Sequence, residues 1–238
     1  MNQIERKAPG KPRPRLSREK RTSDILLAAE AVLEEFGYEH APVAEVARRA
    51  GVVEGTVYHY FETKRDLYVA VAEVWYNRVL QKAPALSNRG NVFENLRELI
   101  LRELFVIRAN PAVVRFILME IRPHPNYRNT KLFAMSRKFT SEITKVLNDG
   151  KESGELVSSL SIRDARDMIF GGIEHRTWAF LRSEGDFDAE RAAQSISSII
   201  YNGLKNRDGE TPPPSKSSLA ERVERLEEAI LDLKNSGK

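Results

Sequence analysis

Two short helical segments, residues 42–49 and 54–61, stand on either side of Gly51, and their spacing constrains the fold more than any other feature of the sequence. Gly51 permits a sharp turn that other residues resist. In the second segment, Val57 and Phe61 lie four residues apart and can pack on the same side. Two helices of about two turns each, joined by a tight glycine turn, are typical of a helix-turn-helix unit.

The second segment carries too many polar and aromatic side chains to be buried on all sides. With Val57 facing inward, Glu54, Thr56, His59 and Tyr60 remain available on the outward side. In a helix-turn-helix unit the second helix enters the major groove of DNA and presents such side chains to the bases and phosphates. We therefore expect the chain to bind double-stranded DNA.

Neighbouring helices are predicted on both sides of this unit. The preceding helix runs from Thr22 or Ser23 to Phe36 on a helical repeat of apolar side chains, and Gly37 ends it. Pro42 suits the first position of the next helix, because its missing N–H is not needed there.

A further helix begins after Thr63, whose hydroxyl can cap it, with Lys64 at its start. Its apolar stripe comprises Leu67, Val71 and either Val74 or Trp75. The DNA-binding domain is therefore expected to span residues 22–68.

The stretch FGYEHAPVAEVARRAGVVEGTVYHYFETKRDL, residues 36–67, resembles the N-terminal DNA-binding domain of the TetR family of transcriptional repressors. The likeness is dense over residues 22–80. It implies phosphate or thymine-methyl contacts from Thr56, Tyr58, Tyr60 and Lys64, and base-edge contacts from Glu54, the backbone of Gly55 and His59. With one arginine of the preceding helix added, the expected DNA contacts are Arg48, Glu54, Gly55, Thr56, Tyr58, His59, Tyr60 and Lys64. A partly buried place for Tyr58 is the alternative.

Three positions depart from the pattern of that family. Ala41 and Pro42 stand where Thr and Ser are usual, and Val53 stands where a Ser, Thr or Asp cap is common. Each lost hydroxyl removes a phosphate contact or a cap, at a cost of about 1 kcal/mol. We expect basic residues at the N-terminus to offset this loss.

Residues 1–21 form a basic segment with eight Lys and Arg against two Glu, a net charge of +6, whereas the whole chain carries +4. Three prolines, a glycine and few apolar side chains predict a mobile, extended arm. Such an arm can lie along phosphates or enter a minor groove. A solubilising tail is the alternative.

Residues 69–207 are predicted to form one larger helical domain, which makes the chain all-α. Its expected helices, beyond the one starting at Lys64, span residues 92–109, 112–121, 127–149, 162–183 and 188–206. The TetR resemblance implies nine helices, with a C-terminal half that binds a small effector and dimerises through the last two. Gly171 and Gly172, together with many Ala and Ser in the last helix, fit close helix packing. We expect a homodimer.

The end of the chain is predicted to carry one more helix. Residues 208–218 are a Pro- and Ser-rich linker, and residues 219–235 form an amphipathic helix. Its apolar residues alternate by four and three and are Leu219, Val223, Leu226, Ile230 and Leu233. This pattern favours a parallel two-stranded coiled coil. Because two heptads alone are marginal, a helix docked on the body of the protein is the alternative.

A basic run over residues 121–141 contains no acidic residue and suggests a place for phosphates. The segments MEIR, residues 119–122, and RDARDMIFGGIEH, residues 163–175, resemble the acyl-CoA-responsive, fatty-acid-degradation branch of the TetR family. We therefore expect an acyl-CoA effector in an apolar tunnel with a cationic mouth. The expected effector-site residues are Trp75, Phe105, Phe116, Met119, Arg122, Arg128, Phe133, Arg137, Glu174, His175 and Trp178. A solvated helix face is the alternative for each basic residue.

The sequence argues against an enzyme. It has no cysteine, its four histidines stand far apart, and it lacks a Gly-rich phosphate loop. We expect no catalytic residue, no metal and no cofactor. No stretch has the roughly 18 apolar residues of a membrane span, so a soluble, cytoplasmic protein without a membrane partner is expected.

These features predict a homodimeric transcriptional regulator, a repressor released from a palindromic operator by a small-molecule effector. A non-specific architectural DNA-binding protein or a coiled-coil interaction protein is the alternative, because the basic arm and the terminal helix suit either one. Footprinting distinguishes the specific regulator, which protects one palindromic site, from a protein that coats DNA uniformly.

Overall fold

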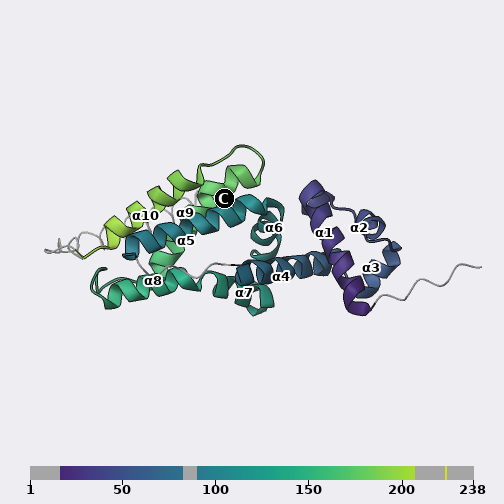
Figure 1. The fold of residues 1–238 in the computed structure, drawn as a ribbon, viewed down its shortest axis with the longest axis horizontal. Coiled ribbons are helices and arrows are strands. Elements are labelled where there is room, and N and C mark those ends of the chain that lie inside the picture. Colours follow the sequence, from purple (N-terminus) through teal and green to yellow (C-terminus); the bar gives the residue numbers. More distant parts are fainter. Residues whose placement is uncertain (1–16, 83–89, 207–222, 224–238) are drawn as a thin grey trace, which may run out of the picture. The chain divides into compact units, whose positions relative to one another are not determined.

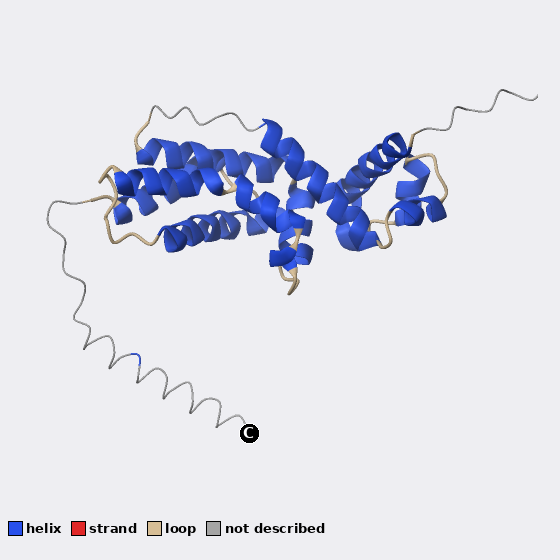
Figure 2. Ribbon diagram, turned by 90° about the horizontal axis from the view of Figure 1, so that it is seen from below, coloured by secondary structure: helices blue, strands red, loops and turns tan. Residues whose placement is uncertain are grey.

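The computed structural model describes residues 17–82, 90–206 and 223, and all the regular elements in these parts are helices (Figure 2). The all-α prediction is therefore confirmed for the described residues. The described residues up to Leu204 form one compact unit.

Several predicted segments lie outside the described residues. They are the arm over residues 1–16, the linker over residues 208–218 and the amphipathic helix over residues 219–235. Val223 is the exception in the last of these, and it is helical and exposed. The coiled coil therefore stays a prediction.

The N-terminal part contains α1 (Arg18–His40), α2 (Val43–Arg49), α3 (Glu54–Tyr60) and α4 (Lys64–Lys82). The first of these begins earlier than the sequence pattern predicts, because the Ser17 hydroxyl accepts a hydrogen bond from the backbone N–H of Lys20 at 3.2 Å. Glu19 also lies in the first turn, where a negative charge stabilises a helix. Residues 18–21 are thus helical, which corrects their assignment to an extended arm.

Two glycines change the direction of the chain in this part, although α1 continues past Gly37 to His40 and does not end at Phe36 as predicted. Gly37 leaves the helical conformation with φ 69° and ψ 163° and kinks α1 near its end. Gly51, with φ 66°, makes the turn between α2 and α3. Pro42 lies just before α2 as its N-cap, in extended conformation, and not at the first helical position that the sequence suggests.

The remaining elements are α5 (Val92–Ala109), α6 (Pro111–Phe116), η1 (Ile117–Ile121), η2 (Tyr127–Asn129), α7 (Lys131–Phe139), α8 (Ser141–Glu152), α9 (Ile162–Leu181) and α10 (Ala189–Leu204). α10 lies along α5 and beside α9, and α8 also contacts both α5 and α9 (Figure 1). α4 packs on α7, while α1 packs on α6. The N-terminal helices α1 and α4 and the C-terminal helices therefore share direct contacts.

The helix predicted over residues 127–149 is broken. α7 ends at Phe139 and α8 begins at Ser141. At the break, the Thr140 hydroxyl donates to the Ser136 carbonyl at 3.0 Å, and the Ser141 hydroxyl donates to the Lys138 carbonyl at 2.7 Å. Hydroxyl groups that bond nearby carbonyls compete with the helical ladder and bend helices.

The helix predicted over residues 112–121 changes its winding midway. α6 starts one residue earlier, at Pro111, and continues after Phe116 as the π-helical turn η1. A backbone hydrogen bond of 2.9 Å from Arg122 N–H to the Ile117 carbonyl closes this wider turn. Such π-helical turns are rare and often occur at functional sites.

Gly150 is helical and buried, although its segment reads as a loop in the sequence. A Cβ atom at this position would lie 2.5 Å from Cγ2 of Val92 and 3.0 Å from Cδ1 of Leu156. The glycine therefore allows α8 to approach α5, and its role is packing and not chain reversal.

Candidate DNA-reading surface and effector region

α3 turns one side to the core and leaves the other side open. Val57 is 1 % exposed, whereas Tyr58 is 43 % exposed. Tyr58 is therefore not a core residue. The other residues of α3 that were expected to contact DNA are exposed or half-buried, and they are Glu54, Gly55, Thr56, His59 and Tyr60.

Neither α2 nor α3 has a side-chain cap at its N-terminus. Pro42 precedes α2 and Val53 precedes α3, and neither supplies a side-chain hydrogen bond. Val53 is itself 74 % exposed. The departures from the family pattern thus leave the first backbone N–H groups of both helices without a side-chain acceptor.

Two arginines at the end of α2 are held by carboxylates. Arg48 donates two hydrogen bonds of 2.7 Å to Glu45. Arg49 donates to Glu45 at 2.7 Å and to Glu35 at 2.6 Å. The hydrogen bonds from both arginines lower the pKa of Glu45 to about 2. Arg48 stays at the surface, with 72 % of its side chain exposed, so a DNA phosphate would compete with Glu45 for it.

Lys64 begins α4, but its ammonium group turns toward the end of α1. Its Nζ donates to the Glu39 carbonyl at 3.1 Å and lies 5.0 Å from the ring centre of Tyr38. Burial lowers the pKa of Lys64. The expected phosphate ligand therefore also ties α4 to α1.

Thr63 caps α4 as predicted. Its hydroxyl oxygen accepts from the backbone N–H of Asp66 at 3.1 Å, and its own N–H donates to the Asp66 carboxylate at 3.1 Å. This reciprocal pair satisfies two backbone donors at the helix start.

An aromatic cluster joins the end of α1 to α6. The ring centre of Tyr38 lies 4.6 Å from that of Phe116 and 5.6 Å from that of Tyr68. Nearby, Arg65 of α4 donates to the Glu120 carbonyl in η1 at 3.0 Å. Phe116, expected in the effector site, is 1 % exposed and connects the DNA-reading helices with the C-terminal helices.

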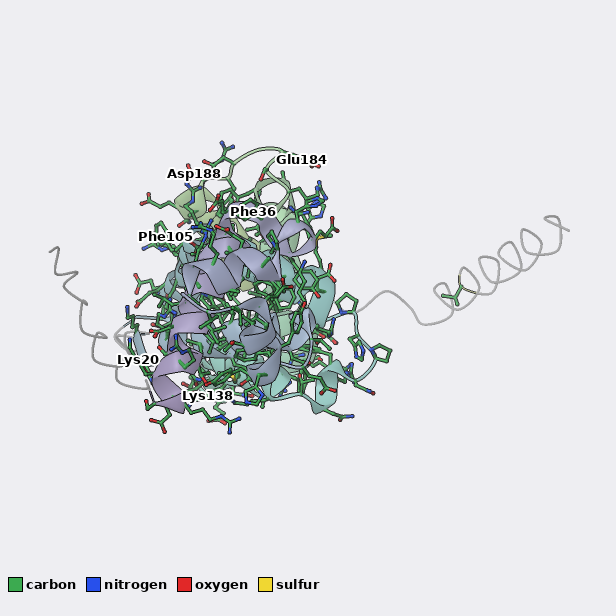
Figure 3. All side chains as sticks on the ribbon, turned by 90° about the vertical axis from the view of Figure 1, so that its right-hand side faces the viewer. Lys20, Phe36, Phe105, Lys138, Glu184 and Asp188 are labelled. Atoms are coloured by element: carbon green, nitrogen blue, oxygen red, sulfur yellow. The ribbon has the colours of Figure 1, made fainter. Side chains whose placement is uncertain are left out.

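The basic residues after η1 lie at the surface. Arg122 forms an ion pair with Glu174 of α9, so the structure brings together two residues expected at the effector site. Lys131 of α7 pairs with Glu73 of α4 at 2.5 Å. The remaining basic side chains of the run are exposed, and they are Arg128, Arg137 and Lys138, the last labelled in Figure 3.

The aromatic residues expected at this site occupy different depths. Trp75 of α4 is 3 % exposed, and its Nε1–H has no hydrogen-bond acceptor among the described residues. Phe133 of α7 is half-buried, with its ring centre 5.4 Å from that of Tyr127. On α9, Trp178 is half-buried and His175 is exposed.

Two expected effector residues do not line the interior. Phe105 is 49 % exposed and Met119 is 43 % exposed. Phe105 lies beside Asp188 at a surface depression (Figure 3). Its expected place in an internal site is corrected, because α5 turns Leu104 and Ile107 inward and leaves Phe105 outside.

Glu103 and Tyr76 are buried polar residues that the sequence reasoning missed. Glu103 of α5 is 8 % exposed, and burial raises the pKa of its carboxyl to about 8 although the charge of Arg102 lowers it in part. Tyr76 of α4 is 6 % exposed, and burial raises its pKa as well. The sequence does contain one indication that Glu103 is buried, because it lies four residues from both Leu99 and Ile107 and therefore on the apolar face of the helix.

The described residues hold no group of three or more His, Cys, Asp and Glu side chains that could bind a metal ion. Within the same parts of the chain, no helix combines the length and the apolar character needed to cross a membrane.

Two family models match the chain. The model for bacterial regulatory proteins of the tetR family matches residues 25–71. The model for the C-terminal region of YsiA-like proteins matches residues 77–203, which is more than half of the 238 residues. The chain belongs to the tetR family of bacterial regulatory proteins.

Individual tetR-family relatives cover most of the chain. The fatty acid metabolism regulator protein of Bacillus subtilis (strain 168) is 23 % identical over 184 residues, 77 % of this chain and 95 % of the relative. The HTH-type transcriptional regulator YvdT of the same organism is 30 % identical over 181 residues, 76 % of this chain and 93 % of the relative.

A solved tetR-family structure has the same fold. The crystal structure of the transcriptional regulator FadR from Bacillus subtilis in complex with stearoyl-CoA superposes with a TM-score of 0.64 at 23 % identity, covering 76 % of this chain and 98 % of that chain. The resemblance to the TetR family in residues 36–67 is thus confirmed. The match of the C-terminal half agrees with its resemblance to the fatty-acid-degradation branch.

Proposed function

We propose that this tetR-family regulator is a homodimeric repressor that leaves its DNA operator when an acyl-CoA binds. DNA binding is supported by the two different faces of α3. Val57 packs one face of the helix into the core, whereas Tyr58 on the other face is exposed. A short helix of this kind, held on a scaffold with its polar side free, fits the major groove.

The proposed DNA contacts divide into two groups. Phosphate or thymine-methyl contacts come from Arg48, Thr56, Tyr58, Tyr60 and Lys64. Base-edge contacts come from Glu54, the backbone of Gly55 and His59. Arg48 and Lys64 already have protein partners, so each would exchange or share that partner on DNA.

The proposed dimer pairs α9 and α10 with the same helices of a second copy. Met168 of α9 is 70 % exposed and Ile199 of α10 is 73 % exposed. A Cβ atom on Gly171 would meet nothing within 4 Å, whereas one on Gly172 would lie 3.7 Å from Ile196. Exposed apolar side chains beside an open glycine suit the self-complementary surface of a two-fold dimer.

An acyl-CoA is supported as the effector by the names of the relatives, one a fatty acid metabolism regulator and one solved with stearoyl-CoA. The basic residues Arg122, Arg128 and Arg137 would receive the phosphates of CoA. The remaining proposed effector contacts are Trp75, Phe116, Phe133, Glu174, His175 and Trp178. Met119 is left out, as Phe105 is, because its side chain is 43 % exposed.

Effector binding would act as a population shift. α4 contains Trp75, a proposed effector contact. It also contains Arg65, which donates a hydrogen bond to the Glu120 carbonyl in η1. An acyl-CoA that prefers one tilt of α4 would move the two α3 helices of a dimer away from the spacing of successive major grooves, about 34 Å. The affinity for DNA would fall.

DNase footprinting on the intergenic DNA upstream of the gene tests the proposal. We expect a two-fold symmetric protected site that disappears with palmitoyl-CoA and persists with free CoA. The Tyr58→Ala variant should protect the same site only at about 5- to 10-fold higher protein concentration while remaining folded, because the side chain is exposed. Uniform coating of the DNA would instead support the architectural protein, and a site unaffected by palmitoyl-CoA would reject the effector.

A further inference from the structure

Glu103 is a buried carboxyl without a partner on the apolar side of α5. Its side chain is 8 % exposed, and Leu99, Ile100 and Leu104 around it on the helix are at most 1 % exposed. Among the described residues no hydrogen bond or ion pair reaches its carboxyl group. The neighbouring Arg102 bonds to Glu142 of α8 instead. A buried polar group that lacks a partner costs free energy, so it points to a missing ligand.

Other polar groups converge on the same part of the interior. The phenol of Tyr76 on α4 shares a hydrogen bond with Ser136 of α7, and its pKa responds to the charges of Glu103 and Arg122 and to Tyr127. These five side chains come from α4, α5, η2, α7 and the residue after η1. Glu103 and Tyr76 are buried, whereas the side chain of Arg122 is 43 % exposed.

Trp75 adds a second unsatisfied group. Its ring centre lies 4.7 Å from that of Tyr76, and its Nε1–H is buried without an acceptor. An indole N–H can only donate a hydrogen bond. Because burial raises the pKa of Glu103 to about 8, its carboxyl is protonated at neutral pH and can donate as well.

Donors without acceptors match a ligand that brings an acceptor oxygen. A saturated alkyl chain would leave Glu103 and Trp75 as unsatisfied as before. An acyl thioester carries a carbonyl oxygen between an apolar chain and a phosphate-bearing CoA. The buried side chains of Glu103 and Trp75 and the exposed guanidinium of Arg122 offer partners to the carbonyl oxygen and to the phosphates, respectively.

We propose that the carboxyl of Glu103, together with Trp75 and Tyr76, binds the thioester carbonyl oxygen of the acyl-CoA effector, while Arg122 faces the CoA phosphates. The assignment rests on the proposed function and specifies how that site distinguishes an acyl thioester from other long-chain CoA derivatives.

Two ligands that differ in the carbonyl alone test the assignment. Palmitoyl-CoA carries it, and S-hexadecyl-CoA, a thioether of the same chain length, lacks it. Titration calorimetry on the full chain should show about tenfold tighter binding of palmitoyl-CoA by the unmodified protein, as expected when a hydrogen bond to a buried partner is lost.

Three variants complete the experiment. Glu103→Leu should lose most of the preference, because the carboxyl donor is gone and only the Nε1–H of Trp75 and the phenol of Tyr76 remain. Glu103→Gln keeps a neutral donor and should retain most of the preference. Glu98→Leu, a change at an exposed glutamate of the same helix, should retain the full preference and serves as the matched control.

The outcomes separate this assignment from the proposed function. If the unmodified protein binds neither ligand, the acyl-CoA effector itself is rejected. If it binds both equally, or if Glu103→Leu keeps the preference, the effector stands and the role of Glu103 is overturned. Loss of the preference in Glu103→Gln as complete as in Glu103→Leu would show that a neutral amide donor does not replace the carboxyl, and it would overturn the role of Glu103 as a neutral hydrogen-bond donor. If Glu103→Leu fails to fold, the affinities of palmitoyl-CoA and S-hexadecyl-CoA for the unmodified protein and for Glu103→Gln still test the assignment.

Discussion

Burial determines the charge state of Glu103, and it makes the stability of the protein depend on pH. The carboxyl has its pKa raised to about 8 in the folded chain, from 4.5 for the exposed group. The folded protein therefore holds the proton more tightly than the unfolded chain does. The contribution of the protonated Glu103 to the free energy of unfolding is therefore complete below pH 4.5 and is lost as the pH rises through about 8.

The first prediction follows from this linkage. Between pH 5 and pH 8 the free energy of unfolding of the unmodified protein should fall by roughly 2 to 4 kcal/mol more than that of Glu103→Leu. Urea unfolding at several pH values measures both curves. Parallel curves for the two proteins would show that Glu103 titrates normally.

Gly150 gives a second prediction at the level of one residue. The Gly150→Ala substitution should destabilise the protein by about 1 to 3 kcal/mol, because the new Cβ would lie 2.5 Å from Cγ2 of Val92. Thermal unfolding of the single variant and of the double variant with Val92→Ala measures this effect. The second change should recover part of the loss, and a double variant that is simply additive would rule out the clash as the cause.

Tyr58 tests the DNA-reading side of α3. Tyr58→Ala should weaken operator binding about 5- to 10-fold, the range for one lost hydrogen bond or phosphate contact, with little change in melting temperature because the side chain is 43 % exposed. Fluorescence anisotropy with a labelled operator duplex measures the affinity. Val53→Ala, a change at another exposed residue next to α3, provides the comparison. Unchanged binding by Tyr58→Ala would remove this residue from the contact set.

At the scale of helices, single residue types predicted several boundaries, although Pro42 lies one position before the first helical residue that it was expected to be. Gly37 and Gly51 have positive φ angles, and Thr63 caps α4, as their residue types suggest. The same reasoning failed at Thr140 and Gly150. Thr140 ends α7 by bonding a carbonyl one turn back, and Gly150 sits inside α8 because Val92 leaves no room for a side chain.

The candidate site could be predicted only in part. The exposed side of α3 follows from helical spacing around Val57, and the pairing of Arg122 with Glu174 joins residues from two segments that the sequence had singled out. The contact of Lys64 with Tyr38 depends on how α4 meets α1, which no local pattern contains. Glu103 was not predicted as a site residue, because a single charged residue within an apolar helix face is ordinarily expected to be exposed.

η1 places the two proposed binding regions within a short distance along the chain. Glu120 accepts a hydrogen bond from Arg65 on the DNA-reading side, and Arg122, two residues later, pairs with Glu174 of α9. A π-helical turn has a less regular hydrogen-bond pattern than the α-helix before it, so it can change its winding at small cost. The element is therefore a suitable place for effector binding to alter contacts with α4.

At the scale of the whole molecule, the dimer gives a fourth prediction. Ile199→Glu should convert the protein to a monomer, because it would place a charge in the proposed apolar contact of α10. Sedimentation velocity measures the assembly state. Leu27→Glu is the matched control, since Leu27 is 69 % exposed and Ile199 is 73 % exposed, but Leu27 lies on α1. A dimer that survives Ile199→Glu would place the two-fold contact elsewhere.

The proposed regulation as a whole requires energetic coupling between operator and effector binding. If palmitoyl-CoA lowers operator affinity by some factor, the operator must lower palmitoyl-CoA affinity by that same factor, because the two binding equilibria share one cycle. Couplings of this kind typically reach about 5- to 150-fold.

The most direct test is therefore one pair of titrations on the full chain, with palmitoyl-CoA binding measured by calorimetry in the presence and absence of saturating operator duplex, and operator binding measured with and without saturating palmitoyl-CoA. We predict that each ligand weakens the other by one common factor of at least fivefold. Tight binding of both ligands with no mutual effect would contradict the account.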